Sequence, residues 1–207
     1  MRPFYRISPV RRVPLFFAAL LFLAALSPEE TRRLASGEVL VSLAPAAGGG
    51  PQEATGRGVI DAPPERVFRA LADYAHWHEF MPFLEKSDLR TGKEGAVESL
   101  HVLKLPAPFG ERRYRVRFTQ RVETGPGGTT WRIGWGSVPG SGNLASHRGS
   151  WTLTAFGPGR TLAVCRLFTD PGGGVPQWMM DRANRKNLPW IFDGLRQHVR
   201  RSRYDGQ

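Results

Sequence analysis

The sequence contains a single cysteine, Cys165, among its 207 residues. One thiol excludes an intramolecular disulfide framework and a four-thiolate metal site. The chain also lacks the G-x-S-x-G pattern of hydrolases, the phosphate-binding loop of nucleotide-binding enzymes and the H-E-x-x-H pattern of metalloproteases. Acidic residues are scarce too, with 18 against 29 basic ones and a net charge of +11. That excess favours contact with anionic partners and carries no information about the fold.

Long hydrophobic runs are missing except for Val13–Leu26, which has 14 residues, and the mean hydropathy of −0.33 excludes a polytopic membrane protein. As a helix this run would span about 21 Å, short of the roughly 30 Å hydrocarbon core of a bilayer. Four arginines precede it and a polar segment follows. The pattern predicts a signal peptide over residues 1–27 and an exported protein, periplasmic or secreted. Pro28 is a poor residue to follow a cleavage site, so an uncleaved membrane anchor is the alternative.

Glycine and proline are abundant, with 24 and 17 residues, and aromatic residues make up 11% of the chain. This composition indicates a turn-rich globular protein of one domain. We expect a short helix, a strand and a Gly/Pro-rich linker over residues 28–52. The ligand-binding domain is then expected over residues 53–203.

Within that domain, the pattern predicts a strand at 55–60, two short helices and a final long helix from Pro176 to about Arg201. Pro189 is expected to kink or break the long helix near Leu188. Between the short helices and the long one, turn residues separate six predicted antiparallel strands. These strands cover 84–90, 96–104, 112–122, 129–135, 149–156 and 160–169.

Two of these strands alternate clearly between apolar and polar residues. Tyr114, Val116 and Phe118 share one face, and the other face of that strand is cationic. The cationic residues are Arg113, Arg115 and Arg117. Such a row is most often a solvated face, and the more specific hypothesis is contact with an anionic membrane surface.

Several sequence pieces stand in an order known from one superfamily. They are Val59-Ile60-Asp61-Ala62-Pro63-Pro64-Glu65-Arg66-Val67-Phe68, Leu71-Ala72-Asp73-Tyr74 with Trp77, Pro106-Ala107-Pro108 with Arg112 and Tyr114, and Asp170-Pro171-Gly172-Gly173 with Pro176 and Trp178. With them the chain resembles the START-like (SRPBCC) superfamily, in its polyketide cyclase and coenzyme Q-binding branch, over residues 55–200. The resemblance implies an α+β helix-grip fold, in which a curved antiparallel sheet wraps around a long C-terminal helix. It also implies an apolar cavity between them that relatives use for lipids, quinones, sterols or polyketides.

The aromatic content favours such a cavity, because six tryptophans would over-fill a small core. Tyr114 and His101 are the polar candidates inside it, although the pattern does not decide which face of the 96–104 strand is inward. The residues predicted to line the cavity are Phe80, Met81, His101, Leu103, Tyr114, Val116, Phe118, Trp131, Ile133, Trp135, Trp151, Leu153, Trp178 and Met179.

Other candidate chemistries are weak. His76 and His78 diverge on a predicted helix, so no metal site is expected. Cys165 is predicted to be a buried apolar residue, and Asp170 before Pro171 a turn residue. We therefore assign no catalytic residue and no cofactor.

The sequence predicts an exported domain that binds, and carries, a hydrophobic small molecule such as a lipid, a quinone or a polyketide-like compound. An aromatase/cyclase enzyme acting in the same cavity is the alternative, and an interaction module with a filled cavity is the third hypothesis. We expect a monomer that does not bind nucleic acid.

Overall fold

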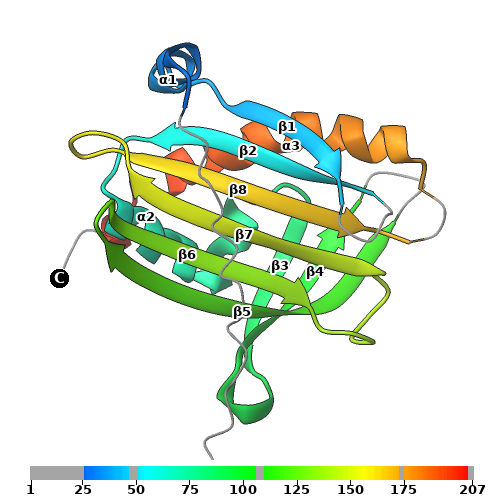
Figure 1. The fold of residues 1–207 in the computed structure, drawn as a ribbon. Coiled ribbons are helices and arrows are strands. Elements are labelled where there is room, and N and C mark those ends of the chain that lie inside the picture. Colours follow the sequence, from blue (N-terminus) through cyan, green and yellow to red (C-terminus); the bar gives the residue numbers. More distant parts are fainter. Residues whose placement is uncertain (1–25, 47–50, 106–109, 173–174, 205–207) are drawn as a thin grey trace, which may run out of the picture.

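The computed structural model describes residues 26–46, 51–105, 110–172 and 175–204. In these ranges eight strands form one antiparallel sheet in the order β1-β2-β8-β7-β6-β5-β4-β3 (Figure 1). The strands are β1 (Leu40–Pro45), β2 (Gln52–Ile60), β3 (Leu84–Thr91), β4 (Val97–Lys104), β5 (Glu111–Gly125), β6 (Gly128–Ser137), β7 (Ser146–Ala155) and β8 (Thr161–Asp170). The six predicted meander strands are all present, and the α+β helix-grip fold is confirmed.

Helices cover the concave face of this sheet. The long helix α3 (Gln177–His198) lies behind β2 and β8, and α2 (Pro64–Ala72) lies on the same side behind β6 and β7 (Figure 1). The 3-10 segment η1 (Tyr74–Glu79) follows α2 and packs on β3. Two further 3-10 turns are η2 (Lys93–Gly95) and η3 (Ser202–Tyr204).

The last helix is predicted to kink or break near Leu188, and a break is wrong because α3 continues through Pro189. Proline in a helix interior removes one backbone hydrogen bond and costs about 3 kcal/mol. Leu188, Phe192 and Leu195 flank this proline and are each fully buried against the sheet. Their burial offsets the lost bond and holds the two halves of the helix together.

The first helix, α1 (Pro28–Ala35), begins with a capping box. Glu30 donates its backbone N–H to Ser27 Oγ at 3.1 Å, and Ser27 donates its own N–H to Glu30 Oε2 at 2.9 Å. Leu34 is fully buried against Val59 and Leu162 in a small second core. β1 pairs with β2 from Leu40 opposite Arg57 to Pro45 opposite Gln52, so this segment is the edge of the same sheet.

The predicted signal peptide lies almost wholly outside the described residues. In the whole described part of the chain, no helix is long and apolar enough to cross a membrane.

Two glycines of β2 allow α3 to approach the sheet closely. A Cβ atom at Gly58 would lie 2.6 Å from Cδ1 of Phe192, and one at Gly56 would lie 2.9 Å from the same ring. Any side chain at Gly58 would therefore collide with the ring. The two glycines therefore leave room for the Phe192 ring against β2.

Candidate ligand-binding cavity

A cavity of about 750 Å³ lies between the concave face of the sheet and the N-terminal half of α3. Its walls are mostly apolar: Leu103 and Leu167 come from the sheet, Met179 and Ala183 from α3, and Met81 from the segment after η1. A volume of this size accommodates a drug-sized molecule.

The structure divides the predicted lining residues into two groups. Seven line the cavity: Met81, His101, Leu103, Tyr114, Trp135, Trp178 and Met179. The other seven do not: Phe80, Val116, Phe118, Trp131, Ile133, Trp151 and Leu153. The role of both groups in ligand binding stays a prediction.

The second group lies outside the cavity because the cavity occupies only one end of the concave face. At the other end, η1, α2 and the C-terminal half of α3 fill the space. Trp151 contacts Phe192 of α3 edge to face at 5.2 Å between ring centroids, and Phe118 stacks on Tyr74 of η1 at 3.8 Å. Strand parity identified the correct face but could not say where along it the helices rest.

Two polar side chains, Tyr114 and His101, lie on neighbouring strands in the wall of the cavity. They sit opposite each other in the β4–β5 pairing, with ring centroids 5.8 Å apart, and both are 2% exposed. The face of β4 that the sequence left open is therefore settled: Ser99, His101 and Leu103 point inward. Within the described residues the Tyr114 hydroxyl makes no hydrogen bond, and burial raises its pKa far above the usual value.

The protonation of His101 follows from its neighbours. Ser87 donates its only hydroxyl proton to the Tyr74 carbonyl at 2.5 Å. The two other polar atoms near Ser87 Oγ, Ser99 Oγ at 3.0 Å and His101 Nε2 at 3.2 Å, must then donate to it. His101 is therefore the Nε2–H tautomer, with Nδ1 as a bare acceptor. Burial, with a smaller contribution from the charge of His147, lowers the pKa of His101 to about 3, so the ring is neutral.

His147, on β7, also lines the cavity, and the sequence analysis missed it. Trp135 donates its indole N–H to His147 Nε2 at 2.9 Å, so the proton of His147 is on Nδ1, which lies 3.0 Å from Thr169 Oγ1. Burial lowers the pKa of His147 to about 4. The strand was expected to begin only at Gly149. The signal that could have found His147 is its parity with Trp151.

Two more groups complete the interior. Asn184 of α3 is 6% exposed, lines the cavity, and has no side-chain hydrogen bond among the described residues. Cys165 also lines the cavity and is buried, as predicted, and burial raises the pKa of its thiol. Asp170 accepts a hydrogen bond from the backbone N–H of Gly172 at 2.9 Å, which is the predicted turn role.

Exposed aromatic side chains surround the opening of the cavity. Phe83, Trp178 and Trp190 line it and are 37%, 65% and 47% exposed. Lys186 lies over the Trp190 ring at 4.6 Å. The opening therefore combines aromatic rings with a cation.

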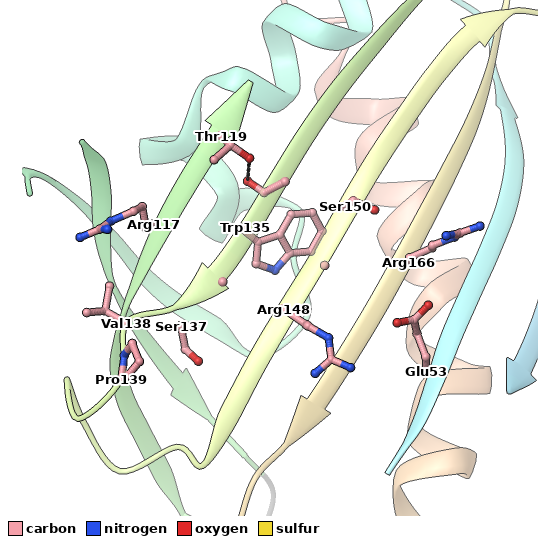
Figure 2. Close-up of a pocket in the computed structure, with 13 residues that line it drawn as sticks. Glu53, Arg117, Thr119, Trp135, Ser137, Val138, Pro139, Arg148, Ser150 and Arg166 are labelled. Atoms are coloured by element: carbon pink, nitrogen blue, oxygen red, sulfur yellow. Dashed lines mark hydrogen bonds between the residues drawn. The ribbon is translucent and has the colours of Figure 1, made fainter. Parts of the chain in front are cut away.

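A second hollow, of about 690 Å³, lies on the opposite, convex face of the sheet. Figure 2 shows Arg117, Arg148 and Arg166 around it, with Glu53 at one side. Gly134 and Gly136 contribute no side chains to its floor. It is more open than the cavity under α3, and a larger share of its lining is polar.

The three arginines predicted to contact a membrane lie on this convex face. Arg115 and Arg117 both bind Glu98, which is 2% exposed, with nitrogen–oxygen distances of 3.2 and 2.8 Å. Arg113 pairs with Glu111. These carboxylates neutralise part of the positive row, and contact with an anionic surface stays a prediction.

His76 and His78 of η1 have different hydrogen-bond partners, and that of His78 is the Ala75 carbonyl. His76 contacts Asp73 at 2.6 Å, and the His76 and His78 rings are 6.4 Å apart. In the described part of the chain, no cluster of three or more His, Cys, Asp or Glu residues could hold a metal ion.

A family model described as polyketide cyclase/dehydrase and lipid transport matches residues 51–200. The chain belongs to this family. The resemblance inferred from the sequence is thereby confirmed. No protein with a curated description matches the sequence.

Solved structures share the START-family fold at low sequence identity. A STAR-related lipid transfer protein from Xanthomonas axonopodis is 22% identical, with a TM-score of 0.62 over 79% of this chain and 94% of that one. The lipid transfer and protein localization domain of human StarD13 is 16% identical, with a TM-score of 0.64 over 79% and 85%. The Zhui aromatase/cyclase from Streptomyces sp. R1128 is 12% identical, with a TM-score of 0.52 over 78% and 94%.

Proposed function

We propose that this START-family chain binds and carries a hydrophobic small molecule, such as a lipid, a quinone or a polyketide-like compound, in the cavity under α3. The observation that carries the proposal is a cavity of about 750 Å³ with mostly apolar walls and a few unpaired polar groups. Burial of ligand surface there would drive binding at about 25 cal/mol per Å². The aromatic opening at Trp178 and Trp190 is a route for an apolar ligand to enter without crossing the sheet.

The polar groups of the cavity suit recognition better than proton transfer. A general acid or base works best when its pKa lies near the working pH. Burial holds the pKa of His101 at about 3 and that of His147 at about 4, and it pushes the pKa of Tyr114 in the opposite direction. In the free protein all three are neutral near pH 7, so they can form hydrogen bonds but exchange protons poorly.

An aromatase/cyclase is the second candidate, because Tyr114 and His101 do lie inside the cavity. The two functions differ in how they respond to Tyr114→Phe. An enzyme loses turnover of a polyketide-like substrate and keeps its affinity, whereas a carrier has only affinity to lose.

The test starts with the full chain purified from its native host without detergent. An organic extract analysed by mass spectrometry is expected to contain a stoichiometric apolar compound. Emptied protein is then titrated with fluorescent 1-pyrenebutanol, which should bind saturably. Ala183→Trp places a large ring in the cavity wall and should abolish uptake, whereas Ala155→Trp, at an exposed site on β7 outside the cavity, should not. No extracted compound together with no saturable uptake would overturn the proposal in favour of an interaction module.

The predicted export, monomeric state and lack of nucleic-acid binding belong to the same proposal. A tethered carrier could not move far from its membrane, so the state of the N-terminal segment decides the range of transport. Sizing chromatography tests the monomeric state, and fractionation of the native cells tests export.

A further inference from the structure

Two polar groups in the wall of the cavity, on His101 and Tyr114, have no hydrogen-bond partner among the described residues. His101 Nδ1 is an acceptor with no hydrogen bond among the described residues, because the Ser87 chain fixes the proton on Nε2. The Tyr114 hydroxyl, on a ring whose centroid lies 5.8 Å from that of His101, has no hydrogen bond in the same residues. Both side chains line the cavity.

Neither atom is shut off from the cavity. In the described part of the chain, the fully enclosed side-chain polar atoms without a hydrogen bond are Trp151 Nε1 and His198 Nδ1. Tyr114 Oη and His101 Nδ1 are not among them although they lack hydrogen bonds, so each remains reachable. An unpaired polar atom in an apolar site costs free energy unless a ligand or water satisfies it.

The neighbouring histidine cannot serve as that acceptor. Both ring nitrogens of His147 are engaged, Nε2 by Trp135 and Nδ1 by Thr169. On the sheet side, a ligand therefore meets one bare nitrogen acceptor and the phenol of Tyr114, which can donate. It also meets the Thr169 hydroxyl, which accepts from His147 Nδ1 and can donate its own proton. On the helix side it meets the Asn184 amide, and Arg182, Lys186 and Asn187 of α3 also line the cavity.

We infer that the cavity selects a ligand whose polar end is a neutral hydroxyl, an alcohol or a phenol, that donates its proton to His101 Nδ1 beside the Tyr114 hydroxyl. This inference rests on the proposed function and specifies the ligand class. A hydroxyl both donates and accepts, so it satisfies the bare nitrogen and the phenol. A ketone, ester or ether presents only lone pairs and leaves His101 Nδ1 unsatisfied. A quinone accepts from donors such as Tyr114 but likewise leaves His101 Nδ1 unsatisfied.

The test compares two probes that differ only in the donor. They are 1-pyrenebutanol and its methyl ether, titrated into the full chain and followed by pyrene fluorescence. The ether still accepts a hydrogen bond from Tyr114 but cannot donate to His101. We expect the alcohol to bind about 10-fold more tightly, the effect of one buried acceptor left without a donor.

The variants locate the preference. His101→Phe should bind both probes with similar affinity, because the acceptor is gone. Asn184→Leu is the matched control on the opposite wall and should retain the preference for the alcohol. A preference that persists in His101→Phe would overturn the inference, since another group would then recognise the donor.

A second measurement does not depend on the folding of His101→Phe. ¹⁵N NMR of the histidine rings reports which nitrogen carries the proton. His101 should show a protonated Nε2 and a free Nδ1, and the Nδ1 signal should shift on addition of the alcohol but not of the ether. The opposite tautomer would overturn the inference.

The outcomes separate this inference from the proposed function. Equal binding of the two probes to the wild-type chain rejects hydroxyl selection and leaves the apolar cavity standing. Failure of both probes to bind rejects the cavity function, and the hydroxyl preference with it.

Discussion

Trp135 donates its indole N–H to Nε2 of His147 at 2.9 Å, which makes the histidine neutral and orients it. The relationship crosses from β6 to β7 along the wall of the cavity. Protonation of His147 at Nε2 would place its new N–H against the indole N–H of Trp135, so that two donors would face each other. The folded chain therefore resists taking up this proton.

Stability should fall at acid pH for this reason. Burial lowers the pKa of His147 to about 4 and that of His101 to about 3. Between these values and the ordinary pKa of about 6.5, the unfolded chain binds more protons than the folded one. The contribution of these two histidines to the free energy of unfolding is therefore complete above about pH 6.5. It is lost as the pH falls toward about 4 for His147 and about 3 for His101, by up to about 1.4 kcal/mol per pH unit for each histidine. Urea denaturation over this range, with His147→Gln for comparison, measures the slope. An unchanged slope in the variant would contradict the assignment.

Gly58→Ala should destabilise the fold by about 1–3 kcal/mol, the usual cost of overpacking a core. The added methyl group would meet the Phe192 ring, which is fully buried and also packs against Trp151. Gly136→Ala in β6 is the control, because a Cβ atom there has nothing within 4 Å. Thermal unfolding of both variants checks the difference. Equal melting temperatures would mean that α3 sits farther from β2.

The fold should tolerate the buried carboxylate of Glu98 only while Arg115 and Arg117 neutralise it. Arg115→Ala combined with Arg117→Ala leaves a carboxylate that is 2% exposed without partners, and we expect a loss of about 3–5 kcal/mol in unfolding free energy. Adding Glu98→Gln to that pair should restore most of the loss, because the uncompensated charge is gone. Arg113→Ala removes only the surface pair with Glu111 and should cost under about 1 kcal/mol. Chemical denaturation of the wild type and the three variants measures their free energies of unfolding. A double variant as stable as Arg113→Ala would refute the proposed role of the two arginines.

Trp178 should matter for the ligand more than for the fold. It is 65% exposed at the opening of the cavity, so Trp178→Ala is expected to change stability by no more than about 0.5 kcal/mol. Release of 1-pyrenebutanol should become several-fold faster, because the opening loses its largest exposed ring. Val122→Ala removes a residue that is 53% exposed and lies outside the cavity lining, and should change neither property. Stopped-flow release kinetics distinguish the two variants.

Local patterns predicted the elements well because each carries its own signal. Alternation along β5 fixed its two faces, and the Gly/Pro turns placed the hairpins. The edge strand β1 was read as belonging to a segment before the domain, since nothing in Leu40–Pro45 indicates its pairing with β2. Pairing between strands depends on residues far away in the sequence.

The cavity was harder to predict for a similar reason. Parity separates Trp135 and Trp151 from the residues of the convex face, yet it cannot separate them from each other. Trp135 lines the cavity and Trp151 packs against Phe192, because α3 rests on only part of the sheet. The state of His101 depends on Ser87 and Tyr74, which belong to other elements and lie at least 14 residues away. Such a network becomes visible only when the strands are placed side by side.

The capping box at the start of α1 would link cleavage of the predicted signal peptide to the rigidity of the sheet. Ser27 supplies both an acceptor and a donor to Glu30, and it is the last residue of the predicted signal peptide. A peptidase that cuts after Ser27 would remove a cap that contributes about 1 kcal/mol to α1. The mature protein would then begin with a frayed first turn ahead of Leu34 and the small core beneath it. A chain that keeps Ser27 would hold its outermost strand more firmly than one that loses it.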